Sequence, residues 1–276
     1  MKLSERNAFF KAGIAFCALS TLLILAASFI VVPVYSGMEE NLRRPSDFFQ
    51  VFIGKFIKAD YLAVHASLIM SVVFSLFGLS FILYYFEQTS SPEIIYVAIF
   101  SVSLSFEALR LILPLNLIYS IPSFYLMISA RALLFVRFFG AFSLLAASIC
   151  AAGLEVQKIH NIILAIFITA LIITFGVPID TGTWDTSLNM SSGYNFHFRM
   201  VEIVVFLCAI LGFFVAVNVH GSRDYAYIGL GVMLAFLGRN LLLKTDNWVC
   251  PVPGIILLSV GTWFMCSKMH KIHLWL

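Results

Sequence analysis

The sequence predicts an all-α, polytopic transmembrane helical bundle, and three observations lead to that fold class. Hydrophobic residues make up 61% of the chain and charged residues only 11%, whereas soluble domains carry ~25% charged residues. The mean hydropathy is +0.99. The apolar residues also fall into runs of ~20 residues, the length that a helix needs to cross a bilayer while satisfying its own backbone N–H and C=O groups.

Eight runs are long and apolar enough to span a membrane, and little sequence remains between them. Since no connection has room for a soluble domain, we expect a single transmembrane domain, which we divide into two parts. Residues 1–60 would form an N-terminal anchor helix and an interfacial segment, and residues 61–276 a seven-helix transmembrane bundle. The predicted spans are 10–35, 61–86, 94–114, 122–152, 159–178, 200–219, 225–243 and 251–267.

The first apolar run follows the basic residues Lys2, Arg6 and Lys11, an arrangement that secretory signals share. Its apolar stretch of ~25 residues is longer than the ~7 to 15 residues of a signal peptide's hydrophobic region. We therefore expect an uncleaved anchor helix.

A phenylalanine stripe marks the segment between the first two spans. Phe48, Phe52 and Phe56 recur at intervals of four residues, while Lys55 and Lys58 fall on other faces. This pattern predicts an amphipathic helix over residues 46–58 that lies in the membrane interface with its lysines directed toward lipid head groups. The same stripe would also serve as a docking site for another protein.

Ionised side chains inside the spans are the strongest functional indication, because each costs ~2.5 to 3.5 kcal/mol on insertion scales. Two acids face four bases, so this layer is positive. We expect an outward-facing polar pocket that holds a small anionic or lipid-like ligand between guanidinium groups. The predicted ligand-binding residues are Glu107, Arg110, Arg131, Glu202 and Arg239; the fourth base is Arg137.

Spacing predicts which of these charges pair. Glu107 and Arg110 are three residues apart and share a helix face. Arg131 lies at a similar depth on the next span, when both are counted from the prolines between the two helices, so it is a second predicted partner of Glu107. Arg137 is deeper and has no obvious acid partner in the sequence. The alternative is that these pairs only hold helices together.

The connection over residues 179–199 is rich in Gly, Ser, Thr, Asn and Asp and is predicted to be a loop. Asp180, Asp185 and His197 would form an outer-surface polar cluster beside Glu202. This cluster supports the alternative function, a membrane-embedded enzyme acting on a lipid-linked substrate at the outer face. The spacing is too loose to assign a metal site.

Other function classes lack a sequence signal. The chain contains no nucleophile elbow, zincin or phosphate-loop motif, so we expect no cofactor. Its five cysteines are scattered and predict neither a disulfide framework nor a zinc site. The net charge of +3 includes no Lys/Arg run of the kind that binds nucleic acid.

An even number of spans places both termini on one side of the membrane. Seven Lys and Arg residues flank the spans on that side and six on the other, so the charges near the termini decide. We predict a multi-pass protein of the cell membrane with both termini in the cytoplasm. Its expected role is receptor-like or that of an accessory subunit, with membrane lipids, a small anionic ligand and another membrane protein as partners.

Overall fold

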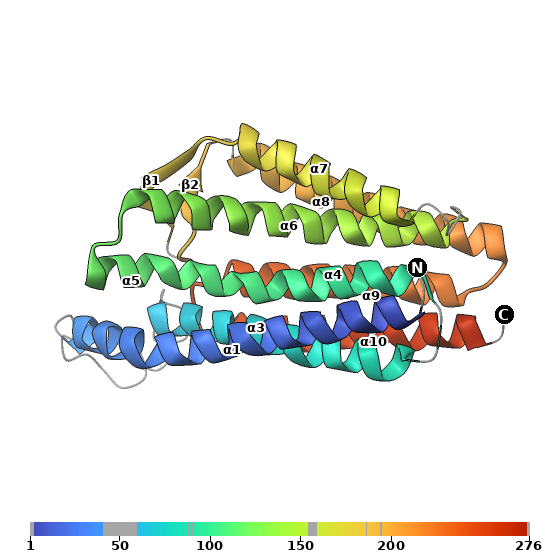
Figure 1. The fold of residues 1–276 in the computed structure, drawn as a ribbon, viewed down its shortest axis with the longest axis horizontal. Helices are drawn as coiled ribbons and strands as arrows, with labels where there is room; N and C mark the ends of the chain where they lie inside the picture. The colour runs from blue at the N-terminus through green and yellow to red at the C-terminus, as the bar shows by residue number, and fades with distance from the viewer. Residues whose placement is uncertain are drawn as a thin grey trace.

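The computed structural model describes residues 3–40, 60–87, 89, 91–153, 159–185, 187–193 and 195–274. Within these ranges eight helices are long and apolar enough to cross a membrane. They confirm the eight predicted spans and the all-α fold class. In Figure 1 the helices run along the long axis of the molecule; α1 starts and α10 ends at one end, and a β-hairpin lies at the other.

The helices follow each other in an up-and-down bundle, with one span built from three pieces. The predicted interfacial helix over residues 46–58 lies outside the described residues. The elements are α1 (Leu3–Glu40), α3 (Tyr61–Phe86), α4 (Glu93–Ser103), η1 (Leu104–Leu111), α5 (Ile112–Tyr119), α6 (Ser123–Ala151), α7 (Ile159–Gly176), β1 (Ile179–Trp184), β2 (Met190–Ser192), α8 (Asn195–His220), α9 (Asp224–Leu243) and α10 (Pro251–Leu274).

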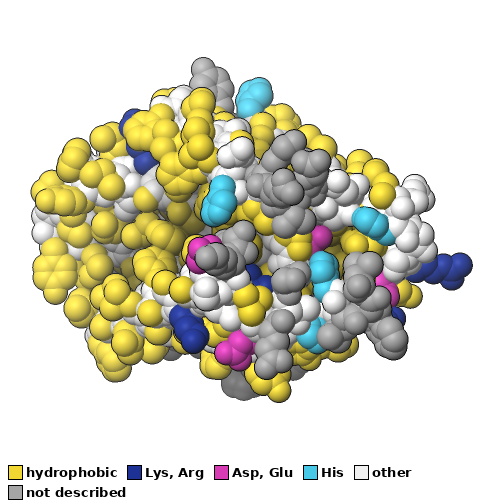
Figure 2. Space-filling model, turned by 45° about the vertical axis from the view of Figure 1, so that its right-hand side comes forward, with side chains coloured by type: hydrophobic (Ala, Val, Ile, Leu, Met, Phe, Trp, Pro, Cys, Tyr) yellow, Lys and Arg dark blue, Asp and Glu magenta, His cyan; other side chains and the backbone are white. Residues whose placement is uncertain are grey.

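The hydrophobic core draws side chains from α1, α3, α4 and α6 to α10, and the span that begins with α4 is the most buried of the eight. α6 packs on α4, α7 and α8, while α9 packs on α8, α10 and α3. α1 packs on α3, α4 and η1, so the predicted anchor helix is joined to the bundle. α7 and α8 leave most of their apolar residues uncovered, and Figure 2 shows broad apolar surfaces beside the end where charged and histidine side chains gather. Such surfaces fit a lipid surrounding.

α9 and α10 approach closely because glycines face each other across their contact. A Cβ atom on Gly238 would lie 2.5 Å from the backbone nitrogen of Leu258 and 2.6 Å from the carbonyl oxygen of Gly254. A Cβ atom on Gly261 would lie 2.6 Å from the backbone nitrogen of Ala235. Small residues let helix backbones come together, which is a main source of helix association in lipid.

The third span contains a 3-10 segment that the sequence did not predict. α4 gives way to η1, which covers Glu107 and Arg110, and α5 then continues through Pro114 to Tyr119. The apolar span ends at Asn116, within two residues of the predicted end, and the helix continues to Tyr119. Pro114 has no N–H to donate to the carbonyl oxygen four residues earlier, which weakens regular α-helical bonding at Arg110.

The predicted loop over residues 179–199 contains a β-hairpin instead. β1 and β2 pair antiparallel, with Ile179 opposite Ser192 and Asp180 opposite Ser191. The pairing is irregular between Asp180 and Trp184. The β-branched and aromatic residues of β1, Ile179, Thr181, Thr183 and Trp184, favour strand structure despite the neighbouring turn formers.

Candidate functional site

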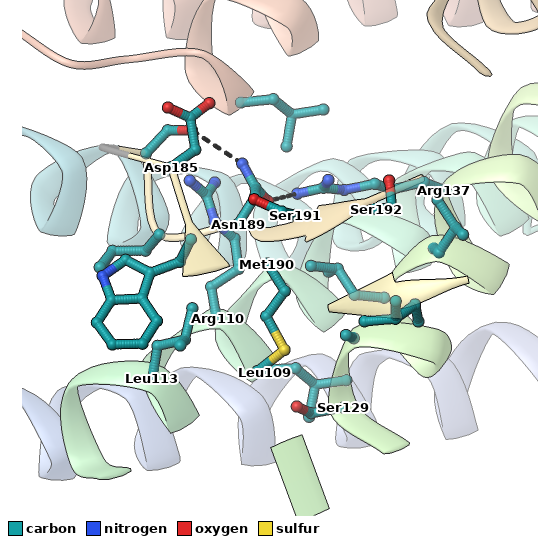
Figure 3. A pocket seen from close by; sticks show the side chains of 18 of the residues that line it. Leu109, Arg110, Leu113, Ser129, Arg137, Asp185, Asn189, Met190, Ser191 and Ser192 are labelled. Carbon is teal, nitrogen blue, oxygen red and sulfur yellow. Dashed lines mark hydrogen bonds between the residues drawn. The ribbon is translucent and has the colours of Figure 1, made fainter. Parts of the chain in front are cut away.

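A cavity of about 590 Å³ lies at the hairpin end of the bundle. Its walls come from η1, α5, α6, α8, α9 and both strands of the hairpin, so segments far apart in the sequence meet there. Figure 3 shows the hairpin over Arg110, Leu113 and Ser129, with Arg137 reaching across from α6 toward Asn189. The volume is in the range of small-molecule sites.

Glu107 is the central acid of the site, and two arginines surround it. Its side chain is only 2% exposed. Arg137 donates from Nε to Oε1 at 2.8 Å and from Nη2 to Oε2 at 2.7 Å, the two-pronged arrangement that makes arginine–carboxylate pairs strong. Arg110 places Nη1 3.6 Å from Oε2. The predicted Glu107–Arg110 pair is therefore confirmed, and the prediction that Arg137 has no acid partner was wrong.

Arg137 also connects the bundle to the hairpin. Its Nη2 donates to Oδ1 of Asn189 at 2.8 Å, and Nδ2 of Asn189 donates to Oγ of Ser187 at 2.9 Å. The sequence does not predict this role for Asn189, because Asn189 lies in a connection whose composition is typical of a polar loop. An amide in a turn carries no distinguishing signal until its tertiary neighbour is known.

A second ion pair lies behind the first. Nη1 of Arg239 donates to Oε1 of Glu202 at 2.6 Å, and its Nη2 donates to the backbone oxygen of Arg137 at 3.4 Å. The Arg239 side chain is 1% exposed, while Glu202 is 22% exposed and lines the cavity. This pair joins α8, α9 and α6 beneath the cavity.

Arg131 lies apart from the other predicted ligand-binding residues. Its guanidinium carbon is 5.3 Å from the ring centroid of Phe175 on α7, and Arg131 is not among the residues that line the cavity. The ion pairs of Glu107 within the described chain go to Arg110 and Arg137, so the predicted pairing with Arg131 was wrong. The distance along the helix axis does not show on which side of the helix a residue lies. Six residues turn an α-helix by ~240°, so Arg131 and Arg137 lie on different faces of α6.

The cavity lining contains part of the predicted outer-surface polar cluster, which stays a prediction. Asp180 is exposed and accepts hydrogen bonds from the backbone nitrogen of Gly182 and from Oγ1 of Thr183, each at 2.8 Å. These two hydrogen bonds hold the pKa of the Asp180 carboxyl below its usual range. Asp185 and Glu202 line the cavity, whereas Asp180 and His197 are not among its lining residues. Within the described ranges no three His, Cys, Asp or Glu residues could hold a metal ion.

The lining of the cavity is amphipathic and carries a positive excess. Its basic residues are Arg110, Arg137, Arg199 and Lys244, and its acidic residues are Asp185, Glu202 and Asp246. Four bases against three acids leave one positive charge. Glu107 and Arg239, which lie just behind the wall, add one charge of each sign and do not change that balance.

The chain is therefore a multi-pass helical membrane protein with a charged cavity at one end of its bundle. No family model, curated protein or solved structure matches it.

Proposed function

We propose that the protein binds a small anionic or lipid-like ligand in this cavity, and that it acts as a receptor-like protein or as an accessory subunit of a membrane complex. The observation that carries the proposal is the positive excess of a cavity enclosed by membrane-spanning helices. An excess of positive charge in surroundings of low dielectric constant attracts an anion more strongly than the same charges would in water.

The distribution of polar groups supports a ligand with a charged end and an apolar body. The lining combines charged and polar side chains with apolar ones, as in most small-molecule sites. The apolar part of the lining includes Leu109, Ile112, Leu113, Leu133, Leu134, Phe138 and Leu243.

The proposed roles require a partner. Between the spans, the described chain forms short connections and the hairpin. A change at the cavity would therefore pass to other molecules through the spans themselves. A second membrane protein in contact with the outer helices is the partner that this arrangement favours, and lipids would cover the remaining apolar surface.

An anionic amphiphile is expected to stabilise the purified protein, whereas a cationic amphiphile of the same chain length is not. We would titrate dodecyl phosphate and dodecyltrimethylammonium into the protein in phosphatidylcholine nanodiscs and follow thermal unfolding. At one hundred times its dissociation constant a ligand adds ~2.7 kcal/mol of stability. Equal shifts with both compounds would indicate partitioning into the bilayer and would contradict the proposal.

The orientation stays a prediction that labelling can check. Thr183 in β1 is exposed, as is Arg223 in the connection at the other end of the bundle. With both termini in the cytoplasm, a cysteine at position 183 should react with a membrane-impermeant maleimide in intact cells, and one at position 223 only after permeabilisation. The background should carry alanine at Cys208 and Cys250, since Cys17, Cys150 and Cys266 are buried. Reversed reactivity would place the cavity on the cytoplasmic side.

A further inference from the structure

Arg110 differs from the other arginines of the site in what its guanidinium binds. Its side chain is 1% exposed and lines the cavity, yet Nε and Nη2 have no hydrogen-bond partner among the described residues. These two atoms lie on the same edge of the guanidinium plane. The edge is therefore a buried two-donor group with nothing to donate to, which is an unfavourable arrangement in a folded protein.

Arg137 shows what such an edge binds. It uses the same two atoms, Nε and Nη2, to hold both carboxylate oxygens of Glu107. Glu107 makes only a longer contact with Arg110, 3.6 Å from Oε2 to Nη1. One carboxylate thus stands between two guanidinium groups, and one positive charge stays uncompensated within this triad.

Arg239 is less suited to binding two oxygens of one anionic group. One of its terminal nitrogens bonds to Glu202 and the other to the backbone oxygen of Arg137, which leaves only Nε without a partner. A single donor cannot hold two oxygens.

We infer that the Nε–Nη2 edge of Arg110 binds the anionic group of the ligand, a carboxylate or a phosphate that presents two oxygens side by side. This inference rests on the proposed function and assigns the ligand's charged end to one residue. Planar two-donor recognition of these groups is characteristic of arginine, and lysine cannot reproduce it.

Asp185 sits where it would compete with the ligand. It follows β1, lines the same cavity and interacts electrostatically with Arg110. The segment that carries it is tied down by the hydrogen bonds of Asn189 to Arg137 and Ser187, and Figure 3 shows Arg110 directed toward this segment. Nε and Nη2 of Arg110 are buried, so an anion must displace neighbouring groups to reach them, and the carboxylate of Asp185 would repel it.

The test is a binding titration of the full chain in phosphatidylcholine nanodiscs by isothermal calorimetry. The probes are dodecyl phosphate, dodecanoate and inorganic phosphate. Arg110→Lys keeps the charge and loses the two-donor edge, so it should weaken binding at least about tenfold, which corresponds to ~1.4 kcal/mol. Arg131→Lys is the matched control, because Arg131 lies outside the cavity lining, and it should bind as the wild type does.

Asp185→Asn supplies an independent test at a more exposed position. Removing a carboxylate near Arg110 should tighten binding of each anion several-fold. If Arg110→Lys does not fold, Asp185→Asn tests the inference by itself. Binding of the anions that is unchanged or weaker in Asp185→Asn would overturn the inference.

The outcomes distinguish a failure of the Arg110 assignment from a failure of the proposed function. Wild-type binding that is lost in Arg110→Lys and kept in Arg131→Lys supports the inference. Wild-type binding that both variants keep overturns the Arg110 assignment and leaves the proposed function standing. No binding of any probe to the wild type overturns both. Tighter binding of dodecyl phosphate than of inorganic phosphate assigns the anion to a lipid, and equal binding assigns it to a soluble ligand.

Discussion

Replacing Glu107 with glutamine should lower the thermal stability of the protein more than any other single substitution at the cavity. The change removes the only carboxylate that faces both Arg110 and Arg137 among the described residues, and it raises the uncompensated charge of this buried triad from one to two. Breaking a buried ion pair by removing one partner typically costs ~3 to 5 kcal/mol. Thermal unfolding in detergent, followed by the fluorescence of a thiol-reactive dye, would measure the loss.

A second substitution should restore much of that stability. In Glu107→Gln/Arg137→Gln the uncompensated charge returns to one, and the two amides can bond to each other. Asp180→Asn serves as the control, because Asp180 is an exposed carboxylate and bonds only within its own hairpin in the contacts described. If the double variant is less stable than Glu107→Gln by the full effect of Arg137→Gln alone, the two side chains are not coupled.

Gly238→Val should also destabilise the protein strongly, through backbone contact. Even the first added carbon would meet the backbone of α10 at 2.5 Å, so α9 and α10 would have to separate. Overpacking of this kind costs ~1 to 3 kcal/mol or more. Gly238→Ala should show a smaller loss, since alanine gains up to ~1 kcal/mol in helix propensity over glycine.

Gly176→Ala is the matched control for this substitution. Gly176 is also a helical residue, at the end of α7, but nothing lies within 4 Å of an added Cβ atom there. Its melting temperature should stay at the wild-type value or rise slightly. A Gly238→Val protein as stable as Gly176→Ala would show that the close approach of α9 and α10 does not contribute to stability.

The spans could be predicted from the sequence because they depend on local composition. A helix in lipid satisfies its own backbone, so ~20 apolar residues suffice to identify it. The charged residues inside the spans were visible for the same reason. Which of them meet depends on how each helix is rotated about its axis, and this rotation comes from packing against the other helices. Depth along the axis therefore paired Glu107 with Arg131, while the structure pairs it with Arg137.

The β-hairpin that lines the cavity could not be predicted, because its position depends on contacts between distant segments. β1 and β2 are short and joined by polar residues, and their pairing becomes favourable above the bundle, where Asn189 meets Arg137 from a position 52 residues away. Ligand binding by Glu107, Arg110, Arg131, Glu202 and Arg239 stays a prediction. The cavity lining includes Arg110 and Glu202 from this set.

The 3-10 segment changes the side of the third span on which the residues after it lie. A 3-10 helix turns ~120° per residue and an α-helix ~100°, so the eight residues of η1 advance the wheel by ~160° beyond the α-helical phase. The rise is also greater, ~2.0 Å against ~1.5 Å per residue, which lengthens the span by ~4 Å. A wheel drawn at constant pitch through α4 would therefore place Leu113 on nearly the wrong side of α5, although Leu113 is buried and lines the cavity.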